Sequence, residues 1–108
     1  MTDLLDLPAR QLVARLACRE LSAEAVARAV IERIEAEEGR LKAWSYFNAD
    51  QVLAQARRLD ATSIRGVFHG LPIGVKDLMD TADMPTTYGS PIYAGHRPRF
   101  DAAAVAAA

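Results

Sequence analysis

The chain has 108 residues, of which 51% are hydrophobic and 25% charged, and its formal net charge is −1 at pH 7. This length suffices for one domain at most. A nearly neutral balance gives no electrostatic basis for binding nucleic acid, and no apolar run approaches the roughly 20 residues of a membrane span. The N-terminus is acidic and lacks the basic region of a signal peptide, so we expect a cytoplasmic protein.

Residues 1–65 are rich in Ala, Leu, Glu and Arg, which indicates a mainly helical layer. We predict a first helix from about Pro8 to Arg19, capped by Asp6. Its apolar stripe consists of Leu12, Val13 and Leu16. The lone Cys18 cannot form an internal disulfide, and we interpret it as a small apolar filler.

A second helix is predicted from about Ala23 to Glu38, with Ser22 as its cap and Gly39 as its stop. The spacing of Glu24 and Arg28 favours an i,i+4 ion pair. Its apolar face consists of Val26, Ala27, Val30, Ile31 and Ile34. We expect the first two helices to form a hairpin with one shared apolar face.

Residues 41–47 alternate enough to predict a short strand, with Trp44 as a core anchor. A third helix follows from about Ala49 to Leu59, capped by Asn48 or Asp50. The side chains expected to face inward are Val52, Ala56 and Leu59. Those expected to face solvent are Arg57 and Arg58.

Composition changes at Gly66, because five of the six glycines fall from there onward. Apolar residues alternate with others over residues 71–76, which is the period of a strand. This predicted strand ends in Lys76 and Asp77 and leads into a loop rich in Gly, Pro, Thr and Ser. The final Ala-rich segment predicts the start of another helix, with Asp101 as its N-cap.

The residues alone leave two interpretations of Lys76. It can be a surface lysine at a strand end, paired with Asp77. It can also be a catalytic base, because a desolvated lysine loses its proton near neutral pH whereas an arginine does not. The chain has only two lysines, Lys42 and Lys76, against eleven arginines, which favours a specific role for the second.

Neither His69 nor His96 has metal-ligand neighbours at a suitable spacing. We therefore expect both to be structural, hydrogen-bonded histidines, and we expect no metal site. No phosphate-binding glycine pattern is present either, and we expect no cofactor.

Three stretches together resemble the amidase signature family: GLPIGVKD at residues 70–77, PTTYGS at 85–90, and Asp101-Ala102. The family includes bacterial amidases, fatty-acid amide hydrolases and the A subunit of glutamyl-tRNA(Gln) amidotransferase. The resemblance covers essentially the whole chain and is specific from Phe68 to Ala102. It implies an α/β fold, with a large mixed sheet wrapped by helices on both sides.

Within that fold, this chain would be the N-terminal segment of the domain and would have an incomplete core. Residues 1–65 would supply the helical layer, with the hairpin and third helix. Residues 66–108 would supply the lysine-bearing strand, the active-site loop and the start of the next helix. The short strands of the mixed sheet would need the remainder of the domain, since two strands alone are only marginally stable.

The resemblance also implies a site. Lys76 matches the lysine of a Ser–cis-Ser–Lys triad, held out of water by its neighbours, while both serines belong to a Gly/Ser-rich segment that this sequence does not contain. The loop implied to line the substrate pocket contains Thr86, Thr87, Gly89 and Ser90. The alternative is a purely structural role, because these residue types are common in turns. We expect Asp77 to point away from Lys76 and to bond backbone or an arginine.

Three functions follow as expectations. The chain can be the N-terminal portion of a hydrolase that cleaves amide bonds of a small molecule, and alone it would be inactive. It can be the corresponding part of a glutamyl-tRNA(Gln) amidotransferase A subunit, which implies partner subunits and a tRNA. It can also be a truncated, non-catalytic binding module. For this segment we expect no nucleic acid or membrane contact, and association either with the remainder of the domain or as a homo-oligomer.

Overall fold

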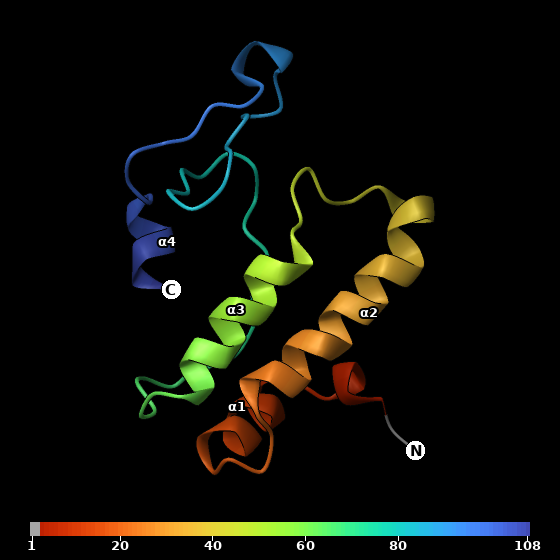
Figure 1. Ribbon diagram of the computed structural model, residues 1–108, viewed down its shortest axis with the longest axis vertical. Helices are drawn as coiled ribbons and strands as arrows, with labels where there is room; N and C mark the ends of the chain where they lie inside the picture. The colour runs from red at the N-terminus through yellow and green to blue at the C-terminus, as the bar shows by residue number, and fades with distance from the viewer. Residues whose placement is uncertain (1–2) are drawn as a thin grey trace. The chain divides into compact units, whose positions relative to one another are not determined.

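The computed structural model describes residues 3–108, which form two compact units, one reaching to Pro72 and the other Ile73–Ala108. The elements in chain order are η1 (Leu4–Asp6), α1 (Ala9–Ala17), α2 (Ala23–Leu41), α3 (Ala49–Asp60), η2 (Pro91–Tyr93) and α4 (Ala103–Ala107) (Figure 1). No helix within residues 3–108 combines the length and the apolar composition needed to cross a membrane.

The α/β class expected from the sequence is wrong for residues 3–108, because this part of the chain contains helices and no strand. Both predicted strands, at residues 41–47 and 71–76, lack a strand partner. Without a neighbouring strand, an extended segment lacks the ladder hydrogen bonds that would satisfy its backbone N–H and C=O groups. Pro72 and Gly74 weaken the second candidate further, since proline has no N–H and glycine has no side chain to pack.

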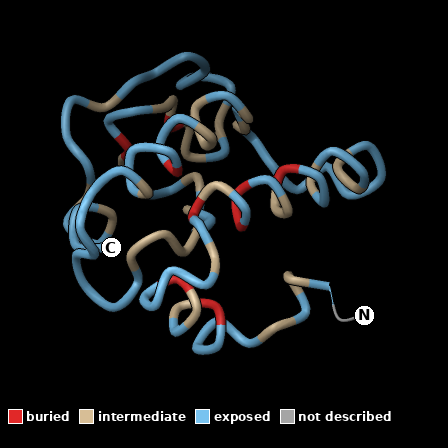
Figure 2. Tube along the Cα trace, turned by 60° about the horizontal axis from the view of Figure 1, so that its bottom comes forward, coloured by how far each residue is buried: buried red, intermediate tan, exposed pale blue. Residues whose placement is uncertain are grey.

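Burial differs between the two units. Figure 2, in which buried residues are red, shows them mainly along the helices. The buried hydrophobic residues all precede Pro72, and they are Leu12, Leu16, Ala23, Val26, Ala27, Ile31 and Ala56. In the described second unit only Thr81 and Thr86 are buried. The apolar core of this chain therefore belongs to its first unit.

The first helix is shorter than predicted. α1 begins after Pro8, and Asp6 lies in η1, so the predicted cap by Asp6 is wrong. Leu12 and Leu16 are buried, as the apolar stripe predicted. Cys18 is exposed, so its interpretation as a packed apolar filler is also wrong.

The second helix begins as predicted and ends later. The Ser22 hydroxyl accepts a hydrogen bond from the Ala25 amide at 3.0 Å, which confirms the cap. The helix continues past Gly39, and Lys42 closes it in a left-handed conformation with φ of 51°. Glu38 explains this extension, because its carboxylate accepts from the amides of Ala43 and Trp44 at 2.6 and 2.8 Å.

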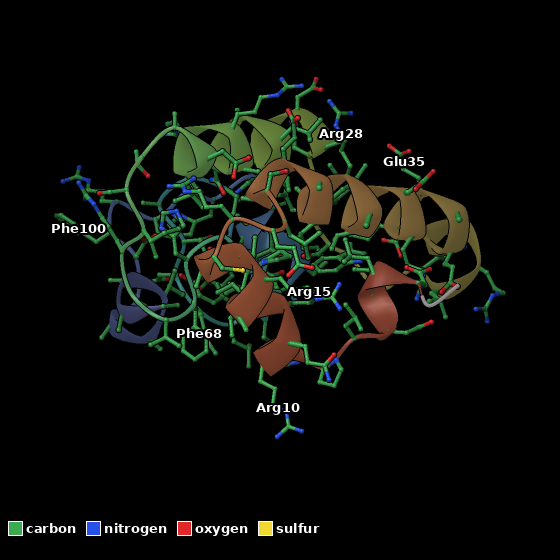
Figure 3. All side chains as sticks on the ribbon, turned by 90° about the horizontal axis from the view of Figure 1, so that it is seen from below. Arg10, Arg15, Arg28, Glu35, Phe68 and Phe100 are labelled. Atoms are coloured by element: carbon green, nitrogen blue, oxygen red, sulfur yellow. The ribbon has the colours of Figure 1, made fainter. Side chains whose placement is uncertain are left out.

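Charged side chains cover the outer faces of these helices. Figure 3 shows Arg10, Arg28 and Glu35 pointing away from them. The predicted pair of Glu24 and Arg28 is confirmed at 3.8 Å, and Glu24 also accepts a hydrogen bond from Arg57 of α3.

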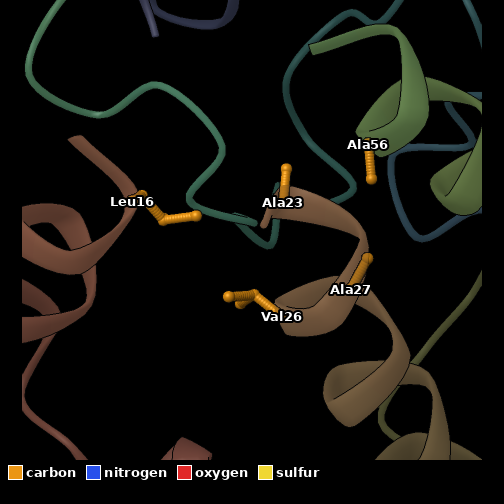
Figure 4. Packing of buried hydrophobic residues seen from close by; sticks show 5 residues of the cluster. All are labelled: Leu16, Ala23, Val26, Ala27 and Ala56. Carbon is orange, nitrogen blue, oxygen red and sulfur yellow. The ribbon is translucent and has the colours of Figure 1, made fainter. Parts of the chain in front are cut away.

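The helices of the first unit meet in one apolar cluster. Figure 4 shows its buried members, Leu16, Ala23, Val26, Ala27 and Ala56. Val26 is 0% exposed, and complete burial of such a side chain contributes about 1.5–3 kcal/mol. The antiparallel neighbour of α2 is α3 (Figure 1), while α1 reaches the cluster through Leu16. The main helix pair of this unit is therefore α2 with α3, and not the expected hairpin of the first two helices around one shared apolar face.

Polar contacts tie the end of α3 to the start of α2. The Asp60 carboxylate accepts from the amides of Ala23 and Glu24 at 2.7 and 3.0 Å. These amides are among those that a helix N-terminus leaves unpaired. Arg19, whose φ is 58°, donates to the carbonyl oxygens of Asp60 and Thr62 at 3.1 and 2.7 Å. One carboxylate and one guanidinium thus connect three helices.

α3 starts as predicted, because the Asn48 side chain accepts from the Gln51 amide at 3.0 Å. Of the three side chains expected to face inward, Ala56 is buried and Val52 is half-buried, but Leu59 is 37% exposed. Trp44 is 41% exposed and contacts Phe47 with ring centroids 6.3 Å apart. The predicted core position of Trp44 is therefore wrong, because the strand that would have buried it does not form.

Candidate active-site segment

Lys76 lies in the second unit, at the start of a tight turn. Its carbonyl oxygen accepts from the amides of Leu78 and Met79 at 2.7 and 3.1 Å. Its side chain is exposed, and within residues 3–108 the ammonium has no hydrogen bond or ion pair. The expectation that neighbouring residues of this chain hold Lys76 out of water is therefore wrong. The alternating strand that would have buried one side of it is absent.

The adjacent carboxylate has a different environment. Asp77 accepts a hydrogen bond from the Thr87 amide at 2.7 Å and another from the Thr87 hydroxyl. These bonds, with weaker ones from the amides of Tyr88 and Gly89, lower the pKa of Asp77 below its ordinary value. The expectation that Asp77 bonds backbone is confirmed.

The predicted pocket residues use their hydroxyls within the loop. Thr86 is 1% exposed, and its hydroxyl lies 2.9 Å from that of Thr81. The Thr87 hydroxyl bonds Asp77, and the Ser90 hydroxyl accepts from the Ile92 amide at 3.3 Å at the start of η2. Lining of a substrate pocket by these residues stays a prediction, whereas their part in holding the loop is visible.

A second carboxylate anchors the far side of this loop. The Tyr88 hydroxyl donates to Asp80, and this bond raises the pKa of Tyr88. The Tyr88 ring meets Tyr93 edge-on, with centroids 5.2 Å apart, and the His96 ring lies 6.0 Å away. The Thr86 amide donates to the His96 carbonyl oxygen at 2.9 Å. Residues 86–96 therefore fold back on themselves.

A third carboxylate closes the unit. Asp101 accepts from the Ala82 amide at 2.7 Å, and the Ala102 amide donates to the Asp80 carbonyl oxygen at 2.8 Å. The predicted N-cap of the last helix by Asp101 is wrong, because α4 begins at Ala103 and its cap position is Ala102. Asp101 instead joins residues 19 positions apart.

His69 makes the side-chain hydrogen bonds that the sequence predicted, whereas the ring of His96 lies against the rings of Tyr88 and Tyr93. His69 accepts from the Arg65 amide through Nδ1 at 3.2 Å. Its Nε2 donates to the Leu59 carbonyl oxygen at 3.0 Å, which requires the neutral tautomer with the proton on Nε2. Among the described residues, no group of three or more His, Cys, Asp or Glu side chains could hold a metal ion.

The second unit therefore carries an exposed amine, that of Lys76, directly before Asp77, whose carboxylate is hydrogen-bonded to Thr87. Sequence reasoning missed the anchoring roles of Asp80 and Asp101. Their signal was available, because aspartates in Gly-, Pro- and Thr-rich stretches commonly accept bonds from loop amides. The sequence could not show which amides they reach.

Comparisons with known proteins identify relatives. A family model described as Amidase matches residues 25–107. The glutamyl-tRNA(Gln) amidotransferase A subunit from Acidothermus cellulolyticus is 41% identical over 97% of this chain and 22% of its own length. The putative amidase AmiD of Mycobacterium bovis is 41% identical over 82% of this chain and 19% of its own length.

The corresponding amidotransferase A subunit from Mycobacterium ulcerans is 36% identical over 94% of the chain and 22% of its own length. The chain thus spans about a fifth of the length of these relatives. No solved structure matches it significantly. The matched range contains Lys76 and the whole loop that Asp77 holds.

Proposed function

The chain belongs to the amidase family, and we propose that it is the N-terminal segment of a hydrolase that cleaves the carbon–nitrogen bond of amides. The observation that carries this proposal is the family match over residues 25–107, which includes Lys76. In this proposal the first 65 residues form an outer helical layer, and residues 66–108 bring the lysine and its loop to the site.

Lys76 acts as the base of a Ser–cis-Ser–Lys relay. The neutral amine takes a proton from a bridging serine, which takes one from the serine that attacks the amide carbonyl. The same relay then returns a proton to the leaving amine. Both serines, and the backbone amides that stabilise the oxyanion, come from a Gly/Ser-rich segment outside residues 1–108.

Water must be removed from Lys76 for this role, because an exposed ammonium keeps its proton. Lys76 is exposed among the residues described, so its desolvation falls to the remainder of the domain. The loop containing Thr86, Thr87, Gly89 and Ser90 forms one wall of the pocket. The hydroxyls of this loop form hydrogen bonds within the chain. In this proposal the loop therefore contacts the substrate through its backbone groups and its surface shape.

The two lysines of the chain allow a matched test in the full-length protein that carries this segment. Lys76→Arg keeps the positive charge but removes the ability to lose a proton. General-base catalysis contributes roughly 10²–10⁴-fold, so amide hydrolysis should fall by at least about 100-fold. The control Lys42→Arg, at the end of α2, should leave kcat unchanged. An active Lys76→Arg enzyme would contradict the proposal.

Residues 1–108 alone should hydrolyse no amide, because a base without its two serines has no nucleophile to activate. Mass-spectrometric assay of the purified chain with a panel of simple amides measures this. The coding sequence after Ala108 provides a second test, since an in-frame Gly/Ser-rich segment is expected. Its absence would favour a truncated, non-catalytic binding module.

A second candidate function is the corresponding segment of an amidotransferase A subunit. It is supported by the relative from Acidothermus cellulolyticus, which carries that name and matches 97% of the chain. This function implies partner subunits, and the two candidates differ in a direct assay. A hydrolase acts on small amides alone, whereas an amidotransferase subunit requires its partners and glutamyl-tRNA(Gln). A cytoplasmic location belongs to both proposals and is measured by cell fractionation.

A further inference from the structure

One side chain, that of Asp77, links the turn after Lys76 to the loop around Thr87. Asp77 directly follows the lysine, and its carboxylate reaches ten residues along the chain to Thr87. One carboxylate oxygen accepts from the Thr87 amide at 2.7 Å, and the other accepts from the Thr87 hydroxyl. The carboxylate therefore fixes the separation between the lysine-bearing turn and the loop.

The loop backbone is shaped to receive an anion. Tyr88 and Gly89 both adopt left-handed conformations, with φ of 55° and 73°. Consecutive residues in such turns direct successive amides toward one point and form an anion-binding concavity. The amides of residues 87, 88 and 89 all interact with the Asp77 carboxylate. A non-glycine residue at positive φ is uncommon, so the contacts of this loop, including the one with Asp77, maintain a conformation that a tyrosine seldom adopts.

Other bonds tie the loop to residues 79–81, which follow further along the chain from Lys76. Asp80 holds the Tyr88 hydroxyl, and Thr81 holds Thr86. Asp77 is the residue that joins the lysine's immediate neighbour to the loop. Since the second unit buries no hydrophobic side chain, apolar packing within it cannot take over this role.

We propose that Asp77 is a positioning residue for the amidase reaction, which fixes the loop of residues 87–89 relative to the lysine-bearing turn, so that the remainder of the domain can cover the amine. This inference rests on the proposed function, in which Lys76 is the base. Asp77 does not touch the reacting atoms in this role. It acts through the loop that it anchors.

The replacement Asp77→Asn tests the carboxylate. An asparagine keeps one acceptor oxygen for the Thr87 amide, but it carries no charge, and its NH₂ group replaces the oxygen that accepts from the Thr87 hydroxyl, so the charge-assisted bonds become weaker neutral ones. In the full-length enzyme we expect kcat to fall between about 10- and 100-fold, the range that misplacement of a catalytic group produces. The acid limb of the kcat–pH profile should also move to higher pH, because a more hydrated amine keeps its proton more readily.

Three further variants make this result specific. Thr87→Val removes only the hydroxyl and keeps both the Asp77 charge and the hydrogen bond from the residue-87 amide. It should give a smaller change in the same direction. Asp77→Glu should restore part of kcat because it keeps the carboxylate. Asp6→Asn replaces an exposed aspartate of η1 and should change neither kcat nor the pH profile. A variant that merely folds less would lower the active fraction without moving the acid limb.

Amide proton shifts provide a readout that needs no catalysis. In the 108-residue chain, the NMR signals of residues 87–89 should titrate together, at a pH below the ordinary carboxylate range, and this titration should vanish in Asp77→Asn.

An enzyme whose Lys76→Arg variant is inactive but whose Asp77→Asn and Thr87→Val variants match the unmodified enzyme overturns this inference alone. So does the absence of a shared titration. A full-length protein that hydrolyses no amide overturns the proposed function together with the positioning role.

Discussion

The two units of the chain are stabilised by different interactions. The unit that reaches to Pro72 has an apolar cluster between three helices, closed by helix caps. The unit Ile73–Ala108 buries two threonines and is held by three aspartates that bond loop amides and hydroxyls.

This contrast bears on the proposed site. The candidate base lies in the unit without an apolar core, where local opening costs least free energy. Large apolar side chains of that unit, including Ile73, Leu78 and Phe100, are more than half exposed. In the proposed enzyme they are available to the remainder of the domain, so the site becomes complete only when that remainder packs against it.

The strongest change in stability should come from the apolar cluster of the first unit. Leu16 is 4% exposed there, and Leu16→Ala should lower the free energy of unfolding by about 2–5 kcal/mol. Urea unfolding followed by helical circular dichroism measures the loss. Leu41→Ala, at a leucine that is 52% exposed, should cost less than about 0.5 kcal/mol. Equal losses in the two variants would contradict the described core.

A smaller effect concerns the polar closure of the same unit. Asp60→Ala removes the acceptor of two amides at the start of α2, and a lost cap costs about 1 kcal/mol. The same urea experiment measures it. Glu35→Ala, on the exposed face of α2, is the control and should change the free energy of unfolding by less than about 0.5 kcal/mol.

The surface ion pairs should matter less again. Glu24→Gln removes the contacts with Arg28 and Arg57, and exposed pairs contribute up to about 1 kcal/mol. The loss should shrink in 1 M salt, where the Debye length is roughly 3 Å. Glu37→Gln, whose contact with Arg40 spans 3.9 Å at a well-exposed site, should show no measurable loss. A loss that salt does not reduce would indicate a different role for Glu24.

The weakest effect on overall stability is a response to acid confined to the second unit. Thr87 lowers the pKa of Asp77 in the folded chain, so its contribution is present above the unfolded value, about 3.9. It is lost as the pH falls through the lower folded value. Amide hydrogen exchange at residues 87–89 should therefore accelerate at that pH before exchange in α2 does. Asp77→Asn should remove this pH dependence, and simultaneous loosening of both units would contradict it.

Local sequence was informative about how helices begin. Ser22 and Asn48 cap α2 and α3 as predicted, because a cap depends on a side chain and amides two or three residues away. The buried faces of α1 and α2 also followed from the spacing of apolar residues. Helix ends were less predictable, since the Glu38 carboxylate extends α2 beyond Gly39.

The candidate site shows the same division. Family resemblance drew attention to Lys76 and to the loop around Thr87, and the family match includes both. Alternation of apolar residues predicted a strand there, but a strand requires a partner that residues 3–108 do not supply. The exposure of Lys76 and of Trp44 follows from the same missing pairing.

Short-range pattern was therefore enough for the helices, for the starting caps of α2 and α3 and for the family, because each depends on neighbours within a turn or on a contiguous motif. Folding in three dimensions decided which carboxylates meet which amides, as in the contacts of Asp60 with Ala23 and of Asp77 with Thr87. These contacts join residues 37 and 10 positions apart. A hydrogen bond between distant residues requires the chain to bring donor and acceptor within about 3 Å, and no local periodicity encodes that approach.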